Sequence, residues 1–306
     1  MRPRDVGLAL LLAVLWGINF VVIKWGLRGV SPFVLGALRF SLAAVPAVFF
    51  LRPPKVPLSL YLWYGLASGL GQFAFLFVAI KVGMPAGLSS LVAQSQVFFT
   101  VLLAALFCGE RPRPIQVAGM TLAAAGLAAI GSAQGVSMPL AGFLLTLCAA
   151  LCWAIGNLAS RALSRHGQVD VLAFVVWSSL IPPLPFLGLA WGFEGRRTLA
   201  TSLAAMDLHS WLAVGYLAWV ATLIGYGLWN RLLRAYAANL VVPFTLLIPV
   251  VGMLAAFLAL GERLSTTQVL GGALVALGLA LPLLAGTRSP KAKAQSPKPE
   301  AQSPKA

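Results

Sequence analysis

The sequence contains two apolar runs that end in the same three residues. Residues 96–111 read QVFFTVLLAALFCGER, and residues 248–263 read IPVVGMLAAFLALGER. A helix needs about 20 mostly apolar residues to cross the roughly 30 Å hydrocarbon core of a bilayer, and both runs lie within stretches of that length. The Gly-Glu-Arg element at residues 109–111 recurs at residues 261–263, an offset of 152. Such a recurrence indicates an internal repeat.

The repeat extends through both halves of the chain. At the same offset of 152 the matching residues are Gln116 with Gln268, Gly119 with Gly271, and Gly126 with Gly278. Near the start of each half the offset is 137, and the matching residues are Trp16 with Trp153, Ile18 with Ile155, Lys24 with Arg161, and Arg28 with Arg165. An insertion around residues 194–207 explains the difference of 15 residues. The sequence therefore predicts two related units, residues 1–133 and residues 134–286.

Charged residues are too few to solvate the surface of a soluble protein. Only 9% of the 306 residues are charged, 60% are hydrophobic and the mean hydropathy is +0.91, whereas soluble domains carry roughly 25% charged residues. The formal net charge of +15 would otherwise suggest a nucleic-acid partner, but the basic residues stand singly or in pairs between apolar stretches. Most of the surface is therefore expected to face a lipid bilayer, and no nucleic-acid partner is predicted.

Ten segments have the length and composition of a membrane-spanning helix. They cover residues 6–26, 32–51, 59–81, 86–108, 114–131, 139–163, 171–191, 210–233, 239–260 and 267–285. Apolar runs this long do not show the alternation of a membrane β-barrel. Each half holds five spans, and because five is odd, the two halves must lie upside down relative to each other. We therefore predict an all-α integral membrane protein with ten transmembrane helices in two inverted five-helix repeats, as is typical of secondary transporters.

The placement of the two termini is predicted from charge and composition. Of the 22 Lys and Arg residues, 15 fall on the side of the predicted membrane that holds both termini, 6 fall on the other side, and Arg39 lies inside a span. Cytoplasmic loops are enriched in Lys and Arg, so both termini are predicted to be cytoplasmic. The N-terminal apolar run is interpreted as an uncleaved first span. Residues 287–306 are rich in Pro, Lys, Gln and Ser, which predicts a disordered basic cytoplasmic tail.

Signatures of catalysis and of ATP use are absent from the sequence. No lysine is followed by Ser or Thr, which excludes a P-loop, and there is no H-E-x-x-H motif. The three cysteines, Cys108, Cys148 and Cys152, are interpreted as packing residues because metal-binding partners are missing nearby. None of the seven carboxylates falls at mid-membrane depth, where proton-coupled transporters usually keep a titratable group. The protein is predicted not to be an enzyme, and no catalytic residue, cofactor or metal ion is predicted.

Polar side chains inside the predicted spans carry the functional signal. Such groups are costly against lipid, so each either bonds a neighbouring helix or lines a cavity; they are Asn19, Gln72, Gln94, Ser95, Gln96, Asn157 and Asn230. Trp16 with Asn19, and Trp153 with Asn157, occur at related places in the repeat, and their spacing puts each pair on one helix face. Gln94 and Gln96 cannot share a face, so only one of them is expected in a cavity. Aromatic walls with amide groups suit a small zwitterionic metabolite.

Charged residues in or near the spans have alternative roles. Arg39 lies inside the second span, where it either bonds carbonyl oxygens at broken helix ends or meets a substrate carboxylate. Glu110 and Glu262 end symmetry-related spans, and they either fix their loops or act as gate residues. Lys81 lies near a span end and is expected to extend its ammonium group to the interface.

Five short stretches point to a known family. They are residues 16–24 (WGINFVVIK), 38–40 (LRF), 72–77 (QFAFLF), 83–88 (GMPAGL) and 220–227 (VATLIGYG). On these stretches the chain resembles the drug/metabolite transporter superfamily of EamA-domain exporters, and within it the bacterial exporters of O-acetylserine and cysteine. The likeness covers about residues 3–286. Residues 72–77 and 84–88 are the more specific stretches, whereas the Gly-Glu-Arg elements and the Arg39 region are shared widely in the family.

The resemblance implies a multi-pass exporter of the bacterial inner (plasma) membrane that moves O-acetylserine and cysteine by alternating access. It also implies a central cavity between the repeats. Together with the polar residues, this predicts the substrate-binding residues Trp16, Asn19, Arg39, Gln72, Gln94, Trp153, Asn157 and Tyr226. A broader amino-acid or drug exporter is the alternative within the family, and an intramembrane enzyme or scaffold is the alternative outside it. The sequence does not specify an oligomeric state.

Overall fold

Ten helical segments of membrane-spanning length make up most of the described chain. The structure, a computed structural model, describes residues 1–133, 138–236 and 238–286. The segments are Pro3–Gly26, Pro32–Phe49, Leu58–Lys81, Ala86–Cys108, Pro114–Ser132, Leu140–Leu163, Val171–Glu194, Leu208–Ala235, Val242–Leu260 and Thr266–Leu283. The ten predicted spans are therefore confirmed, with ends that differ from the prediction by a few residues. The predicted disordered tail, residues 287–306, lies outside the described residues.

The first half combines straight helices with interrupted ones. The first two spans are α1 (Pro3–Gly26) and α2 (Pro32–Ala44), the latter followed by the 3-10 helix η1 (Ala47–Phe49). The third span is α3 (Leu58–Tyr64), the π-helical η2 (Gly65–Gly71) and α4 (Gln72–Lys81). The fourth is α5 (Ala86–Val92), the 3-10 turn η3 (Ala93–Ser95) and α6 (Gln96–Cys108), and the fifth is α7 (Pro114–Ser132).

The second half follows the same order with one addition. It begins with α8 (Leu140–Leu163) and η4 (Ser164–His166), followed by α9 (Val171–Ser178), α10 (Pro183–Leu189) and η5 (Ala190–Glu194). The short helix α11 (Thr198–Ala205) occupies the region in which the repeat predicts an insertion. The eighth span is α12 (Leu208–Gly215), the π-helical η6 (Tyr216–Ile224) and α13 (Gly225–Ala235). The last two spans are α14 (Ala238–Val241), η7 (Val242–Leu246) and α15 (Leu247–Leu260), then α16 (Thr266–Gly286).

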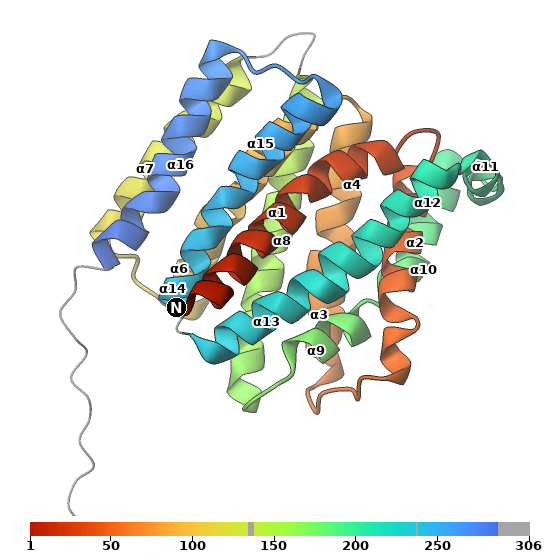
Figure 1. Ribbon diagram of the computed structural model, residues 1–306, viewed down its shortest axis with the longest axis horizontal. Helices are drawn as coiled ribbons and strands as arrows, with labels where there is room; N and C mark the ends of the chain where they lie inside the picture. Colours follow the sequence, from red (N-terminus) through yellow and green to blue (C-terminus); the bar gives the residue numbers. More distant parts are fainter. Residues whose placement is uncertain (134–137, 237, 287–306) are drawn as a thin grey trace, which may run out of the picture.

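The last helix of each half, α7 and α16, pack side by side along their length (Figure 1). A Cβ atom at Gly119 would lie 2.5 Å from the carbonyl oxygen of Gly278, and one at Gly126 would lie 2.5 Å from that of Gly271, so only glycine allows this close approach. The repeat equates Gly119 with Gly271 and Gly126 with Gly278. Each glycine thus meets the counterpart of the other, which is the contact pattern of two antiparallel helices related by a two-fold axis. Likewise, α1 packs on α15 as α8 packs on α6.

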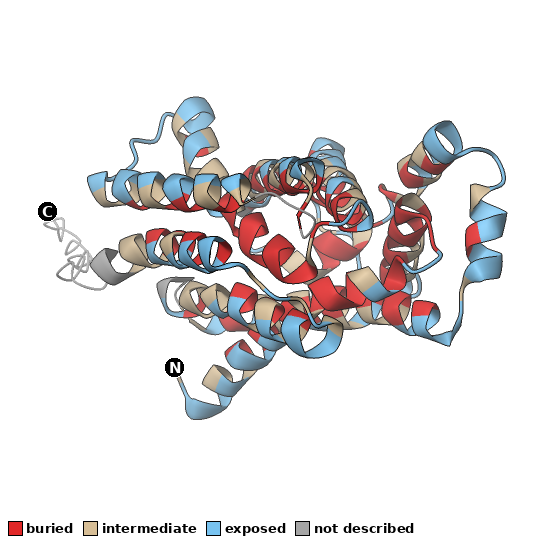
Figure 2. Ribbon diagram, turned by 90° about the horizontal axis from the view of Figure 1, so that it is seen from above, coloured by how far each residue is buried: buried red, intermediate tan, exposed pale blue. Residues whose placement is uncertain are grey.

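Buried residues gather in the middle of the bundle, and the outer faces are apolar and exposed (Figure 2). The largest core cluster joins α1, α2 and α4 with helices of the second half, and it contains Phe20, Ile23, Leu35 and Phe77. Large exposed apolar side chains on the outside include Phe49, Phe107, Leu184 and Leu258. In water such a surface would aggregate, whereas hydrocarbon chains solvate it, which is consistent with a membrane setting.

Candidate functional site

A small cavity lies between the two repeats, and both contribute to its wall. Its volume is about 70 Å³, several times the roughly 10–15 Å³ that a single water molecule needs. The first repeat contributes side chains from α1, α2, α4 and η3, and the second contributes α8, η6, α13 and α15. The lining residues are Trp16, Asn19, Phe20, Arg39, Gln72, Phe73, Leu76, Ala93, Gln94, Ala149, Ala150, Trp153, Ala221, Tyr226 and Ile248.

The cavity brings together seven of the eight residues predicted to bind substrate, namely Trp16, Asn19, Arg39, Gln72, Gln94, Trp153 and Tyr226. Asn157 is placed elsewhere. Its Nδ2 donates hydrogen bonds to Gln96 Oε1 at 2.6 Å and to Thr100 Oγ1 at 3.1 Å, which joins α8 to α6. Of the two glutamines that cannot share a helix face, Gln94 therefore lines the cavity and Gln96 bonds a neighbouring helix.

The aromatic part of the wall is held in place by contacts across the repeat interface. Trp16 Nε1 donates a hydrogen bond of 3.0 Å to the carbonyl oxygen of Ala221, in the π-helical segment η6. The ring of Trp16 lies 5.5 Å from that of Tyr226 and 5.9 Å from that of Trp229, measured between ring centroids. The hydroxyl groups of Tyr226 and Tyr64 are 3.4 Å apart. These contacts give the cavity one rigid aromatic side.

The amide part of the wall is buried and unsatisfied. The residues Asn19, Gln72 and Gln94 are 8%, 8% and 4% exposed, and all three line the cavity. Asn19 Oδ1 is a fully buried acceptor without a partner. Buried polar groups are normally hydrogen-bonded to protein, water or ligand. A fully buried acceptor without a partner, next to two further buried amides, therefore favours a polar occupant.

Arg39 presents a positive charge to the same cavity. It is 4% exposed, and its Cζ atom lies 3.8 Å from the ring centroid of Phe73 and 5.5 Å from that of Phe40. Its Nε and Nη1 atoms are buried without a hydrogen-bond partner in the described chain. Of the two roles left open by the sequence, carbonyl bonding at broken helix ends is therefore not found in the described part of the structure. Arg39 also borders a second cavity of about 20 Å³, beside Tyr64 and Tyr226.

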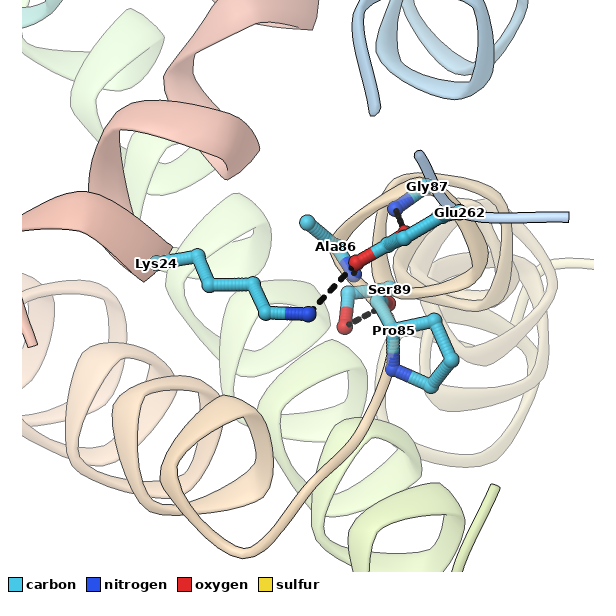
Figure 3. A network of polar contacts seen from close by, with 6 residues as sticks. All are labelled: Lys24, Pro85, Ala86, Gly87, Ser89 and Glu262. Atoms are coloured by element: carbon cyan, nitrogen blue, oxygen red, sulfur yellow. Dashed lines mark hydrogen bonds and ion pairs between the residues drawn. The ribbon is translucent and has the colours of Figure 1, made fainter. Parts of the chain in front are cut away.

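An ion pair joins the two repeats at the end of the bundle where α1 and α15 finish (Figure 3). α15 ends at Gly261, whose φ of 66° lies in the left-handed region that favours glycine, and the next residue, Glu262, turns back towards α1. Its carboxylate accepts a hydrogen bond of 2.7 Å from Lys24 Nζ and bonds of 2.9 Å from the backbone N–H groups of Ala86 and Gly87. Glu262 is thus bound at the first turn of α5.

The symmetry-related ion pair lies at the opposite end of the bundle. α6 ends at Gly109 with the same φ of 66°, and the following Glu110 accepts a hydrogen bond from Arg161 at the end of α8. This guanidinium holds the pKa of the Glu110 carboxyl below its usual value. The side chains of this pair are 55% and 46% exposed, compared with 37% and 12% for Lys24 and Glu262. The pairs are therefore equivalent in sequence but differ in burial.

A wide cleft of about 540 Å³ opens between the end of α8 and α13. Trp229 lines this cleft and packs against Trp16, which lines the central cavity. An aromatic contact thus joins a residue of the cleft lining to a residue of the cavity lining. Of the polar in-span residues, Asn230 lines this cleft, and its Nδ2 also donates a hydrogen bond of 3.2 Å to Asp170 Oδ1. The lining residues are Ser160, Leu163, Gly167, Gln168, Val169, Val171, Trp229, Asn230, Leu233 and Arg234.

The described residues contain neither a candidate metal site nor a disulfide bond. These contain no cluster of three or more His, Cys, Asp or Glu side chains that could hold a metal ion. Cys108 and Cys148 are exposed and Cys152 is half-buried, all as free thiols. The site consists of hydrogen-bonding, aromatic and cationic groups, which can bind a solute reversibly.

Comparison with known proteins adds close relatives. The chain is 47% identical over 282 residues to the "Probable amino-acid metabolite efflux pump" of Escherichia coli (strain K12), covering 91% of this chain and 94% of the relative. The protein of the same name from Salmonella typhimurium is 48% identical with the same coverage. The "Probable terminal-alkyne amino-acid exporter" of Streptantibioticus cattleyicolor is 28% identical over 286 residues, covering 91% of this chain and 93% of the relative.

The fold and the repeat are matched as well. A solved crystal structure superposes with a TM-score of 0.64 at 22% identity, covering 95% of this chain and all of the other, which shows a shared fold. The model of the EamA-like transporter family matches twice, at residues 5–132 and at residues 140–284. With this family model matching both halves and relatives matching nearly its whole length, the chain belongs to the EamA-like transporter family.

Proposed function

We propose that this protein is a secondary transporter of the bacterial inner membrane that exports small amino-acid metabolites, O-acetylserine and cysteine among them, by alternating access. The cavity between the two repeats carries the proposal, because buried amides line it and the amide oxygen of Asn19 has no hydrogen-bond partner among the described residues. The names of the 47% and 48% identical relatives support amino-acid metabolites as the cargo. Amides both donate and accept hydrogen bonds, so they can hold an ammonium and a carboxylate weakly enough for release.

The difference between the two ends of the bundle supports alternating access. Towards the Lys24–Glu262 end, the bundle is packed with fully buried apolar side chains such as Ile23 and Phe77. Towards the other end, the aromatic contact of Trp16 with Trp229 is followed by the cleft of about 540 Å³. With both termini cytoplasmic, this arrangement is a state that faces the cytoplasm and is closed to the outside.

We expect the two ion pairs to form and separate in turn as the protein changes between such states. The repeat equates Lys24 with Arg161 and Glu262 with Glu110, so each pair is the counterpart of the other at the opposite face. In the state open to the outside, we expect the Arg161–Glu110 pair to become buried and the Lys24–Glu262 pair to separate. Exchange of conformation between inverted repeats is how transporters of this architecture move a central site from one side to the other.

The composition of the cavity wall bears on the energy source. None of its lining residues is an Asp, a Glu or a His. A proton-coupled carrier usually titrates such a group near its substrate. We therefore expect transport that follows the substrate gradient and does not require a pH gradient.

Proteoliposomes test this function directly. Uptake of labelled L-cysteine under reducing conditions should be saturable, should be inhibited by unlabelled O-acetylserine, and should be the same with and without a pH gradient. Protein-free liposomes give the diffusion background. Absence of saturable uptake of both solutes, together with unchanged release from cells that overproduce the protein, would show that the proposed cargo is wrong. Inhibition by chemically diverse amino acids or drugs would instead indicate a broader exporter.

A further inference from the structure

Arg39 is a buried cation for which the described chain provides no anion. Arg39 takes part in none of the ion pairs of the described residues, and Glu262 and Glu110 pair with Lys24 and Arg161 instead. The groups that do surround the guanidinium are the rings of Phe40 and Phe73 and the tyrosine-lined second cavity. Arg39 is therefore held on aromatic faces, with hydrogen-bond donors left unused.

A charge in this position is costly unless something pairs with it. Buried charges in proteins are normally paired, and unpaired ones inside a membrane are among the most unfavourable groups a fold can contain. Two of the three guanidinium nitrogens of Arg39 are buried without an acceptor, and the residue lines the central cavity. A planar guanidinium matches the two oxygens of a carboxylate. The missing anion is thus supplied most simply by the solute that enters the cavity.

The cavity offers the complementary group as well. Asn19 Oδ1 is a buried acceptor without a partner, and Asn19 lines the cavity together with Gln72 and Gln94. An ammonium group has three donors to satisfy and no acceptor. Because the wall contains no carboxylate, this end of the site is polar but uncharged. A zwitterion would therefore gain more from its carboxylate than from its ammonium group.

We propose that Arg39 binds the carboxylate of the transported solute and that the amide oxygen of Asn19 accepts a hydrogen bond from its ammonium group, so that the cavity selects small solutes with a free carboxylate. That the solute is an amino acid rests on the proposed function. The solute binds in one orientation, with its carboxylate at Arg39. The seventh span, Val171–Glu194, which corresponds to the span of Arg39, carries no Lys or Arg that could bind a carboxylate at the equivalent place. The site is thus asymmetric inside a symmetric scaffold.

Three thiols that differ by one group each test the proposal in the wild-type protein. L-cysteine carries both groups, 3-mercaptopropionate lacks the ammonium group, and cysteamine lacks the carboxylate. As inhibitors of labelled L-cysteine uptake into proteoliposomes, 3-mercaptopropionate should remain effective and cysteamine should be weaker by about tenfold or more, the size of a lost charge-assisted hydrogen bond. Equal inhibition by the two analogues would overturn the role of Arg39.

Substitution of Arg39 gives the second arm. Arg39→Gln should raise the KM for L-cysteine by about tenfold to a hundredfold and should abolish the preference for 3-mercaptopropionate over cysteamine. Arg39→Lys, which keeps the charge but not the fork, should restore the preference in part. Arg196→Gln removes an exposed arginine outside the spans and serves as the matched control. A preserved preference in a folded Arg39→Gln protein would contradict the proposal.

A binding measurement separates this inference from the proposed function. Thermal stabilisation of the purified protein in detergent by each of the three thiols reports occupancy of the cavity without requiring flux. Carboxylate-selective stabilisation without any transport would leave the Arg39 site standing and would refute the exporter. Transport of L-cysteine with equal stabilisation by 3-mercaptopropionate and cysteamine would support the exporter and would refute the Arg39 site. If Arg39→Gln fails to fold, the comparison of analogues on the wild-type protein still decides the question.

Discussion

Neutralising Glu262 tests whether its ion pair keeps one end of the transporter closed. In Glu262→Gln the side chain keeps its size, but it loses its charge and one acceptor oxygen. The carboxylate accepts hydrogen bonds of 2.9 Å from each of two backbone N–H groups, those of Ala86 and Gly87. Bonds to charged groups contribute about 1.5–3 kcal/mol and neutral ones about 0.5–1.5 kcal/mol. The two N–H groups bond different oxygens, so the bond that the amide oxygen keeps weakens by about 1 kcal/mol and the other, worth at least about 1.5 kcal/mol, is lost.

The ion pair adds less than these backbone bonds. Lys24 is 37% exposed, so solvent screens its attraction to Glu262, and the contribution is at most about 1 kcal/mol. The substitution should therefore destabilise the closed arrangement by about 2.5–3.5 kcal/mol. At about 1.4 kcal/mol per tenfold, this shifts the balance between the closed and open ends by about 60-fold to 300-fold.

Chemical labelling measures this shift. Ile23 is fully buried beside Lys24, so an Ile23→Cys substitution, made with the three native cysteines replaced by serine, places a thiol behind the closure. A membrane-impermeant maleimide added from outside should react at least about tenfold faster when Glu262→Gln is also present. Glu110→Gln, at the other end, is the matched control and should not accelerate the reaction. Equal rates with and without Glu262→Gln would refute the closure.

Four further outcomes follow from the structure. Gly126→Leu should prevent close pairing of α7 and α16 and reduce the yield of monodisperse protein on size exclusion, whereas Gly7→Leu, with no atom within 4 Å of its Cβ, should not. Asn157→Ala should lower the thermal unfolding temperature and leave the KM for cysteine nearly unchanged, whereas Asn19→Ala should raise that KM by about tenfold. Arg161 lowers the pKa of the Glu110 carboxyl, so the stabilisation that Glu110 provides should be constant above about pH 5 and be lost as the pH falls below the usual pKa of 4.5. The difference in unfolding temperature between the wild-type protein and Glu110→Gln measures this stabilisation. Reporter fusions after residues 55 and 235 should behave as cytoplasmic and those after residues 29 and 205 as periplasmic.

The spans could be predicted because length and hydropathy alone decide them. Lipid tolerates no exposed backbone polar group, so each long apolar run has to be a helix whatever its neighbours are. The repeat could be read because paired residues such as Glu110 and Glu262 keep their spacing from span ends. The π-helical segments η2 and η6 could not be predicted, since their apolar sequences do not differ from those of ordinary helices.

The candidate site could be predicted only in part, because the role of each polar residue depends on which residue it contacts in the folded protein. A polar residue inside a span has either a helix partner or a cavity, and the sequence does not say which. Asn157 and Gln96 satisfy each other across 61 residues of chain, which becomes visible only when α8 packs against α6. Small apolar residues of the wall, such as Ala93, Ala149 and Ala221, carry no signal at all, because helix packing selects the same residues.

The scaffold of this chain is repeated, whereas the proposed substrate site is not. The ion pairs, the glycine contacts and the interrupted spans occur twice, as the proposed exchange of conformation between the repeats requires. A substrate site built by the same repetition would treat both ends of a solute alike, and it could not distinguish a carboxylate from an ammonium group. Arg39 has no cationic counterpart in the second half, so it breaks the equivalence at the one place where orientation matters. A solute without a carboxylate would leave that charge unpaired, and its exclusion from the cavity follows from the same cost that makes an isolated arginine rare inside a membrane.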